Sequence, residues 1–222
     1  RYGFHGLSYE YIVTTLQKQN RLPRRTIVAH LGNGASIAAL LCGVSIDTTM
    51  GMTPMGGMVM SKRSGDIDPG ALLYMMRALG LSTSDLEKTV GREAGLLGIS
   101  ELSSDVRTLL ASRGTNAKAA DAIDVFTYQA RRFIGAYAAA LGGLDLLVFT
   151  GGVGEHSAEI RAEICTGLEF LGIALDEERN QANAEIISAG PGAVRVAVMQ
   201  TNEEAMIARD VQRALARRSV AE

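Results

Sequence analysis

The chain has 222 residues, enough to bury a substantial hydrophobic core, and its 47% apolar and 21% charged residues are ordinary for a globular protein. A net charge of −2, with basic residues spread along the chain, argues against a nucleic-acid-binding face, and no apolar run approaches the roughly 20 residues of a membrane span. Two isolated cysteines, Cys42 and Cys165, fit a reducing cytosol better than a disulfide scaffold, so we expect a cytoplasmic protein.

The first part of the sequence predicts a helix followed by strands. Residues 8–20 carry apolar side chains at helical spacing. Residues 26–31 and 36–41 are apolar runs typical of strands, and Gly32-Asn33-Gly34 between them is a strong turn signal. We therefore expect an antiparallel hairpin with a glycine-rich tip, to which residues 44–49 add a third strand.

The next segments predict a loop and then helices. Residues 50–67 have no clear period and contain many glycines and methionines, which indicates an irregular loop. Asp68 as N-cap and Pro69 at the first helical position predict a helix that Gly80 closes. Residues 119–141 place apolar side chains at steps of three and four, which predicts a long amphipathic helix.

The last part of the sequence returns to strands. Residues 144–150 form a short apolar run consistent with a strand buried on both faces. Gly151 to Gly154 follow as a turn, and a helix with its apolar face over residues 160–171 comes next. A late strand over 194–199 precedes a final helix from about Glu203. Strands alternating with helices, together with one early hairpin, predict an α/β domain with a mixed sheet.

Three glycine-bearing segments, residues 4–6, 30–34 and 151–156, each contain one of the chain's three histidines. The last two follow apolar strands, where glycine lets backbone N–H groups approach a phosphate without a Cβ in the way. Histidine can donate a hydrogen bond to phosphoryl oxygens or move protons near pH 7. Ordinary turns, with histidines that cap or pack beside them, explain each segment equally well, and the residues alone leave both interpretations open.

Charged residues form two further candidate sites. Lys62 and Arg63 place two cations in one loop, where a fixed guanidinium could stabilise a phosphoryl-transfer transition state. The alternative is a solvated basic loop paired with Asp66 or Asp68. Neither a complete G-x-G-x-x-G nor a G-x-x-x-x-G-K-[ST] motif is present in the sequence, so the standard dinucleotide and P-loop interpretations fail and a dehydrogenase is a distant alternative.

Taken together and in order, six segments resemble the motifs of the acetate kinase family. They span nearly the whole chain, which makes the resemblance far more specific than any one motif. They are Arg1-Tyr2-Gly3-Phe4-His5-Gly6, His30-Leu31-Gly32-Asn33-Gly34, Asp47 to Pro54, Arg63-Ser64-Gly65-Asp66-Ile67-Asp68-Pro69, Gly151 to Glu155, and Thr201-Asn202-Glu203-Glu204.

The resemblance implies an actin-like, hexokinase-like ATPase-type domain (ribonuclease H-like), with a mixed sheet and helices on both faces. Family members are about twice as long, so the chain is expected to be their C-terminal part. Residues 1–202 would form the nucleotide-binding domain. Residues 203–222 would be a closing helix whose apolar side (Ala205, Met206, Val211, Leu215) packs on a missing N-terminal domain. The chain opens at Arg1, inside a motif, from which we expect a fragment, a processed product or a domain of a longer protein.

The resemblance also implies the reaction and its partners. The complete enzyme would transfer a phosphoryl group reversibly between ATP and acetate by direct in-line displacement, giving ADP and acetyl phosphate, with Mg²⁺. It would be a cytoplasmic homodimer that binds neither nucleic acid nor membrane. The alternatives are a propionate kinase or a catalytically incompetent nucleotide-binding and dimerisation fragment.

Site residues follow motif by motif from the same resemblance. His5 is expected to steady the transferring phosphoryl group and Arg63 to stabilise the transition state. Phe4 and Pro54 are expected in an apolar pocket for the acyl chain, and Glu203 is expected to help hold Mg²⁺. The expected nucleotide-binding residues are His30, Leu31, Gly32, Asn33, Gly34, Asp105, Val106, Arg107, Gly152, Val153, Gly154, Glu155 and His156.

The sequence departs from the family pattern at several positions. Leu7-Ser8-Tyr9 stands where the family usually has Thr-Ser-His, and Ser61-Lys62 stands where Gly-Thr usually precedes the arginine. His156 replaces a frequent Asn, and Gly56-Gly57 replaces a bulkier pair. These differences bear on acyl-chain and nucleotide preference rather than on the class of reaction.

Overall fold

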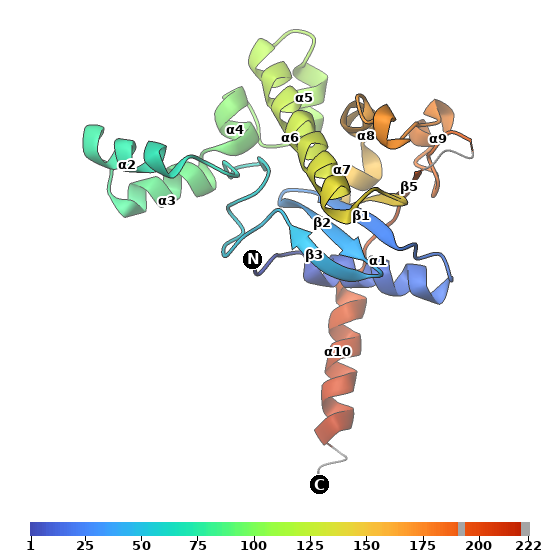
Figure 1. The fold of residues 1–222 in the computed structure, drawn as a ribbon. Helices are drawn as coiled ribbons and strands as arrows, with labels where there is room; N and C mark the ends of the chain where they lie inside the picture. Colours follow the sequence, from blue (N-terminus) through green and yellow to red (C-terminus); the bar gives the residue numbers. More distant parts are fainter. Residues whose placement is uncertain (191–193, 219–222) are drawn as a thin grey trace.

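A five-stranded mixed sheet forms the centre of the computed structural model, which describes residues 1–190 and 194–218 (Figure 1). The strand order is β3-β2-β1-β4-β5, and the bounds are β1 Arg25–Leu31, β2 Ala35–Leu41, β3 Val44–Thr48, β4 Leu146–Thr150 and β5 Arg195–Val198. β1, β2 and β3 pair antiparallel as consecutive hairpins, whereas β4 pairs parallel with both β1 and β5. The predicted hairpin, third strand and mixed sheet are therefore confirmed.

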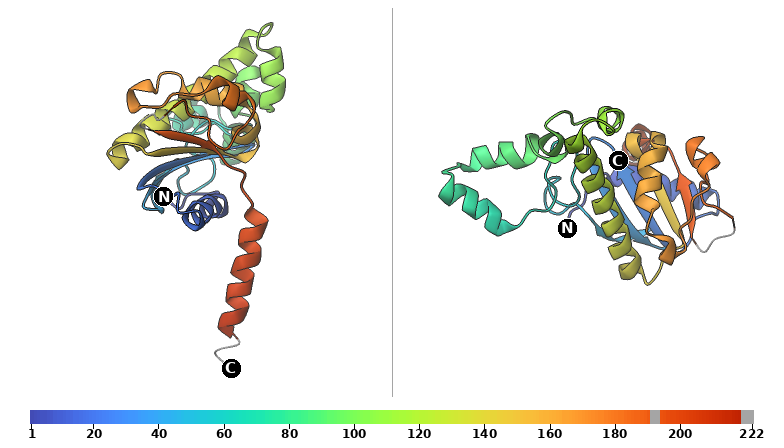
Figure 2. Two further views of the ribbon diagram at one scale, coloured as in Figure 1. Left: turned by 90° about the vertical axis from the view of Figure 1, so that its right-hand side faces the viewer. Right: turned by 90° about the horizontal axis from the view of Figure 1, so that it is seen from above.

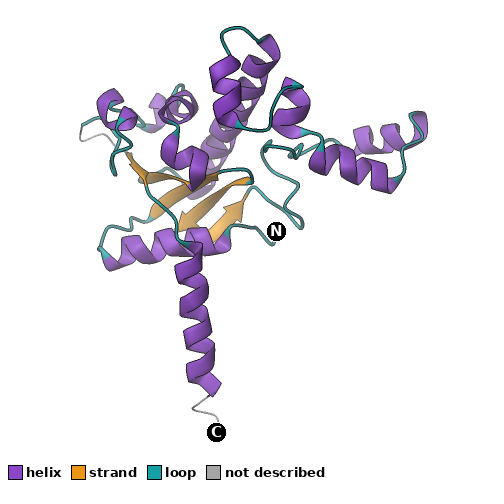
Figure 3. Ribbon diagram, turned by 180° about the vertical axis from the view of Figure 1, so that it is seen from behind, coloured by secondary structure: helices purple, strands orange, loops and turns teal. Residues whose placement is uncertain are grey.

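Both faces of the sheet are buried. Alternate residues of β1 point to opposite sides, so Ile27 and Ala29 pack into one core and Val28 into another. The long helix α6 (Ala117–Leu141) and α8 (Ala158–Cys165) cover the first face, and α1 (Gly6–Lys18) covers the second (Figures 2 and 3). β4 is buried along its whole length, as its continuous apolar run predicts.

Shorter helices connect these layers. The helix predicted after Asp68 and the long helix predicted over 119–141 are both present, as α2 and α6, and further short helices lie between them. The segment after β4 is helical at once rather than a free turn. The bounds of the shorter helices are α2 Pro69–Ala78, α3 Thr83–Arg92, α4 Gly95–Ser100, α5 Val106–Ser112, α7 Gly151–His156, the 3-10 helix η1 Glu169–Leu171 and α9 Glu177–Gln181. Helix α2 begins as predicted, because the Asp68 side chain accepts a hydrogen bond from the Gly70 amide and Pro69 follows it.

Helices α2 and α3 form an arm that extends away from the sheet (Figure 1). No residue of α2 is buried, and Leu73 and Leu79 are 55% and 61% exposed. In α3 only Leu86 is buried. The arm thus presents apolar side chains to its surroundings instead of adding to the core.

Helix α10 (Glu203–Arg218) projects from the face of the molecule that carries α1, in a different direction from the arm (Figures 1 and 2). Its start matches the predicted boundary at residue 203, but the expectation that Met206 lacks a partner within the chain is wrong. Met206 is only 3% exposed, and Arg209 pairs with Glu10 of α1. Farther along, Val211 and Leu215 are 52% and 60% exposed. Residues 219–222 of the expected closing helix lie outside the described residues.

Within residues 1–190 and 194–218, none of the helices combines the length and the apolar character needed to cross a membrane.

Candidate functional site

The tip of the β1–β2 hairpin is the centre of the site. Residues 32–34 close it with a hydrogen bond from the Gly32 amide to the Gly34 carbonyl (3.1 Å). The tip also contacts the loop that precedes α2, because the Ser61 amide donates to the Asn33 carbonyl (3.4 Å) and the Ser61 hydroxyl donates to the Asn33 side-chain oxygen (3.4 Å). A cavity opens on each side of this contact.

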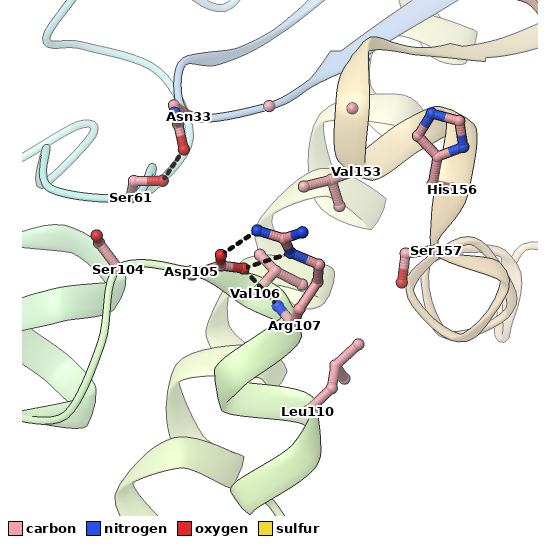
Figure 4. Close-up of a pocket in the computed structure, with 12 residues that line it drawn as sticks. Asn33, Ser61, Ser104, Asp105, Val106, Arg107, Leu110, Val153, His156 and Ser157 are labelled. Atoms are coloured by element: carbon pink, nitrogen blue, oxygen red, sulfur yellow. Dashed lines mark hydrogen bonds and ion pairs between the residues drawn. The ribbon is translucent and has the colours of Figure 1, made fainter.

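The larger cavity has a volume of about 770 Å³ and brings together three segments that are far apart in the sequence (Figure 4). It is bounded by the hairpin tip, the start of α5 and the start of α7. Eight predicted nucleotide-binding residues line it: Gly32, Asn33, Asp105, Val106, Arg107, Gly152, Val153 and His156. Ser61, Ser104, Leu110 and Ser157 complete the lining and were not predicted.

At the start of α5, Asp105 and Arg107 face the larger cavity as a hydrogen-bonded pair (Figure 4). The Asp105 carboxylate accepts hydrogen bonds from the Arg107 amide (2.8 Å) and from its guanidinium Nη2 (2.6 Å). These bonds from Arg107 hold the pKa of Asp105 below its usual range. The Arg107 side chain is 91% exposed, so the pair adds little to folding stability and both groups are accessible to a ligand.

The cavity is not lined by five of the predicted nucleotide-binding residues, namely His30, Leu31, Gly34, Gly154 and Glu155. Glu155 has a backbone role, because its carboxylate accepts hydrogen bonds from the amides of Gly151 (2.9 Å) and Thr201 (3.3 Å). It therefore ties the start of α7 to the segment that leads into α10.

The wall formed by α7 is held in place from two sides. Gly151 has φ +77° and approaches β1 so closely that a Cβ would lie 2.8 Å from the Leu31 carbonyl oxygen. Behind the helix, the fully buried Arg161 donates to the Gly154 carbonyl (2.9 Å) and to the Asn180 side chain (2.8 Å). Sequence reasoning missed Arg161, since its position inside the core depends on the packing of α8 against α7.

His5 and His30 lie together behind the hairpin tip. Their rings stack with centroids 4.1 Å apart and an interplanar angle of 14°. His30 Nδ1 is 2.9 Å from the Ser8 hydroxyl, and His5 Nδ1 is 2.8 Å from the Ser36 hydroxyl. Burial, and then the neighbouring Arg63 guanidinium, lower the pKa of His5. Burial, and then His5, lower the pKa of His30 to about 4, so both rings are neutral at pH 7.

The two predicted catalytic side chains meet at Gly34. A Cβ at Gly34 would lie 3.2 Å from His5 Nε2 and 3.4 Å from Arg63 Nη1, so only glycine leaves the present space between them. Arg63 Nη1 donates to the Pro54 carbonyl (3.1 Å). Within the described part of the chain, no carboxylate forms an ion pair with Arg63, which leaves its positive charge available to an anion.

The backbone around Arg63 is fixed by the start of α4. The Leu96 and Leu97 amides donate to the Met60 and Ser61 carbonyls (2.9 and 3.0 Å). Gly95, with φ +65°, makes this approach possible, because a Cβ there would lie 2.1 Å from the Met60 carbonyl oxygen and 2.8 Å from the Arg63 amide nitrogen.

Substitution of Gly95 by alanine is therefore expected to lower the free energy of unfolding by about 2 kcal/mol or more, through left-handed backbone strain and overpacking. Urea denaturation measures the effect. Gly135→Ala in α6 is the matched control, because its Cβ would meet no atom within 4 Å and helix propensity favours alanine there by about 1 kcal/mol. Equal stability of the Gly95 variant and the parent would contradict this account of how the Arg63 turn is held.

A second cavity of about 460 Å³ adjoins the first and shares Asn33, Ser61 and Ser104 with it. Its other lining residues are Lys62, Arg63, Gly91 and Arg92. Among residues 1–190 and 194–218, Lys62 and Arg92, like Arg63, form no ion pair, so three uncompensated cations surround one space. Arg92, at the end of α3, belongs to no motif in the sequence, and only the fold brings it beside Lys62 and Arg63.

Phe4 and Pro54, the two residues predicted for the acyl pocket, line neither of these two cavities. Phe4 packs against the core and lines a separate cavity of about 290 Å³ with Tyr2 and Tyr9, whereas Pro54 contacts Arg63 through its carbonyl group. Together the two do not line one pocket in the described chain.

Glu203, the first residue of α10, forms no ion pair among the residues that the structure describes. No group of three or more His, Cys, Asp or Glu side chains suited to a metal ion exists in that part of the chain either. Mg²⁺ is usually held by one or two carboxylates together with substrate phosphates rather than by a cluster of protein ligands.

Comparison with known proteins adds an independent line of evidence. Residues 1–209 match the family model described as the acetokinase family. Over 226 aligned residues the chain is 47% identical to a propionate kinase of Citrobacter rodentium, an alignment that covers all of this chain and 56% of that protein. It is 44% identical to an acetate kinase of Clostridium botulinum, covering 95% of this chain and 55% of the relative. The chain therefore spans about half the length of the curated relatives it matches.

Solved structures agree with the sequence match. The crystal structure of Porphyromonas gingivalis acetate kinase superposes with a TM-score of 0.91 at 42% identity, over 97% of this chain and 56% of that one. A propionate kinase from Francisella tularensis gives a TM-score of 0.88 at 38% identity, over 93% of this chain and 54% of that one. The predicted fold class, an actin-like, hexokinase-like ATPase-type domain with helices on both faces of a mixed sheet, is confirmed by these neighbours. On the family match, the identities and the shared fold together, the chain belongs to the acetokinase family.

Proposed function

We propose that the chain binds ATP or ADP in the larger cavity and forms one wall of a phosphotransferase active site. The complete enzyme would move a phosphoryl group reversibly between ATP and a short carboxylate, by direct in-line displacement. The observation that carries the proposal is the convergence of the hairpin tip, α5 and α7 on one cavity of about 770 Å³, beside His5 and Arg63. A volume of this size suits a small-molecule or cofactor site.

The adjoining cavities suggest how a nucleotide would lie. The larger one offers apolar side chains, Val106, Leu110 and Val153, with Asp105 and Arg107 as polar groups, which suits a nucleoside. The phosphates would pass Asn33 and Ser61 into the smaller cavity, where three cations are uncompensated. Phosphoryl transfer needs positioning and charge stabilisation more than covalent chemistry, and such a cation cluster supplies both.

The carboxylate substrate is proposed to be acetate or propionate. Relatives of similar identity carry the names propionate kinase and acetate kinase, so identity does not separate the two. One methylene group is worth only about 1–3 kcal/mol of discrimination in an apolar pocket. Phe4 and Pro54 remain the proposed apolar contacts, completed by the part of the relatives that this chain does not span.

Mg²⁺ is part of the proposal as the ion that neutralises phosphate charge during transfer. Glu203 is the proposed carboxylate ligand, and its segment is tied to the start of α7 through the bond from the Thr201 amide to Glu155. A cytoplasmic location is also proposed, because Cys42 and Cys165 are both free thiols.

A second function has support of its own, namely a nucleotide-binding and dimerisation module without catalysis. The exposed apolar residues of the α2–α3 arm, Leu73, Tyr74 and Leu79, favour association with another protein surface. A homodimer, which the resemblance implies, would bury them. This module would bind nucleotide in the same cavity but turn over no substrate.

Nucleotide binding is tested by filling the larger cavity. Gly152 lines it, and a Cβ there would meet no atom within 4 Å, so Gly152→Leu adds bulk to the cavity without straining the protein. We expect ATP affinity, measured by titration calorimetry on the 222-residue chain, to fall about tenfold or more, which corresponds to about 1.4 kcal/mol. Gly114→Leu, also in open space but away from the cavity, should leave it unchanged. Equal ATP affinity of the Gly152 variant and the parent would remove this cavity as the nucleotide site.

A further inference from the structure

His5 is held by an unusual backbone conformation and by a row of hydroxyl groups. It is the N-cap of α1 with φ +60° and ψ +26°, a left-handed conformation that is uncommon outside glycine and that clusters at functional sites. Its Nδ1 is 2.8 Å from the Ser36 hydroxyl, and the Tyr9 hydroxyl bonds the same Ser36 oxygen. Tyr9, Ser36 and His5 Nδ1 therefore form one hydrogen-bonded row beneath the hairpin tip.

The direction of the hydrogen bonds in this row follows from counting donors. Ser36 has one hydroxyl hydrogen, and a neutral imidazole has one N–H, on either Nδ1 or Nε2. If Tyr9 donates to Ser36, then Ser36 donates to His5 Nδ1, and the His5 proton resides on Nε2, on a ring that is only partly buried.

The opposite direction moves the unpaired hydrogen from the partly buried His5 ring to the buried Tyr9 hydroxyl. His5 Nδ1–H would donate to Ser36 and Ser36 would donate to Tyr9, so the Tyr9 hydroxyl hydrogen would need another partner. Within the described residues Tyr9 has only Ser36 as a partner, and Tyr9 is 8% exposed. A buried donor without an acceptor costs about 1–3 kcal/mol, which favours the first direction.

We propose that Tyr9 is a positioning residue: through Ser36 it keeps His5 in the neutral tautomer with the proton on Nε2, the nitrogen that faces Gly34 and Arg63. This inference rests on the proposed function, in which His5 Nε2 donates a hydrogen bond to the transferring phosphoryl group. The location of Nε2, 3.2 Å from where a Gly34 Cβ would lie, places that donor at the hairpin tip rather than in the core.

Tyrosine suits this position because its hydroxyl group does not ionise near neutral pH. Burial raises the pKa of Tyr9, so its hydroxyl keeps its proton throughout the range in which histidines titrate. The resemblance places a histidine here in most of the acetate kinase family, and an imidazole would itself change protonation in that range. The Tyr9 row should therefore hold the His5 tautomer constant with pH.

The test is long-range ¹H–¹⁵N NMR on the 222-residue chain, whose three histidines give a simple spectrum. In the parent we expect His5 to show the pattern of an Nε2–H tautomer. In Tyr9→Phe, Ser36 is free to accept, and we expect His5 to shift towards the Nδ1–H form. Ser36→Ala should shift it as well, because Nδ1 then loses its donor. Tyr11→Phe, whose hydroxyl has no hydrogen bond in the described structure, should leave the tautomer unchanged.

A second measurement separates this inference from the proposed function. In the complete enzyme, Tyr9→Phe should lower kcat about tenfold or more with little change in KM for ATP. Complete loss of one transition-state hydrogen-bond donor lowers kcat by a factor of about 10²–10³, and in this variant only a fraction of the molecules would lack the Nε2–H donor. An unchanged His5 tautomer in both Tyr9→Phe and Ser36→Ala would overturn the inference whatever the activity. A changed tautomer with an unchanged kcat would overturn the role of Tyr9 in the reaction and the proposed role of His5 with it.

Discussion

Replacing Arg63 by alanine in the complete enzyme is expected to lower kcat by about two to three orders of magnitude, while the Kd for ATP changes only a few-fold. The Arg63 guanidinium lies beside His5 and Gly34 and forms no ion pair in the described chain, so its charge is available when negative charge spreads over the transferring group. An interaction made mainly in the transition state lowers kcat without weakening ground-state binding. Loss of one such fixed donor typically costs about 10²–10³ in rate.

The measurement is a coupled assay for acetyl phosphate, with ATP binding measured separately by calorimetry. Arg63 also donates to the Pro54 carbonyl, so the variant's melting temperature must be compared with that of the parent. Arg179→Ala is the matched control, because among the described residues Arg179 forms an ion pair only with Asp176, the N-cap of α9, and its loss should leave kcat unchanged. If Arg63→Ala keeps the parental kcat, Arg63 has no part in catalysis.

Much of the sheet could be predicted because its signals are local. The apolar runs of β1 and β2 flank Gly32-Asn33-Gly34, and a turn of that composition joins neighbouring strands wherever it occurs. The run that forms β4 is apolar on both faces and short, a pattern typical of a central strand. Asp68 and Pro69 fix the start of α2 by their own chemistry, independent of distant contacts.

What the sequence could not predict depends on contacts between distant segments. Arg92 joins Lys62 and Arg63 only because the α2–α3 arm returns to the hairpin tip. Glu155 belongs to a motif of the family, yet its carboxylate accepts hydrogen bonds from the backbone amides of Gly151 and Thr201. It thereby joins the start of α7 to the segment before α10. Met206 has an apolar side chain on a projecting helix, and its burial at α1 depends on where that helix leaves the sheet.

The N-terminal segment gives a further example. A site residue close to a chain end is expected to be poorly ordered unless it is tied down. Here the Tyr2 amide donates to the Gly51 carbonyl (3.1 Å) and the Arg1 guanidinium donates to the Thr49 carbonyl (2.7 Å). His5 is then fixed by Ser36 and by its stack on His30. These contacts join segments that are far apart in the sequence, so the sequence alone could not predict them.

The 222-residue chain alone is expected to form no acetyl phosphate, although it should still bind ATP. In-line phosphoryl transfer needs the donor, the acceptor and the stabilising charges held together in a closed site. This chain provides His5, Arg63 and the two adjoining cavities, but it spans only about half the length of its relatives, 56% of the Citrobacter rodentium protein. Phe4 and Pro54 do not form a closed acyl pocket within it.

The isolated chain should also self-associate, because Leu73 and Leu79 on the α2–α3 arm and Val211 and Leu215 on α10 are all more than half exposed. Sedimentation velocity at several concentrations measures this association, and calorimetry with ATP checks that the nucleotide site is intact. The coupled assay then compares the chain with a full-length relative at equal concentration. ATP binding without turnover is the expected result. Turnover within about tenfold of the full-length relative would show that this chain holds a complete active site, and the argument that it supplies only one wall would be wrong.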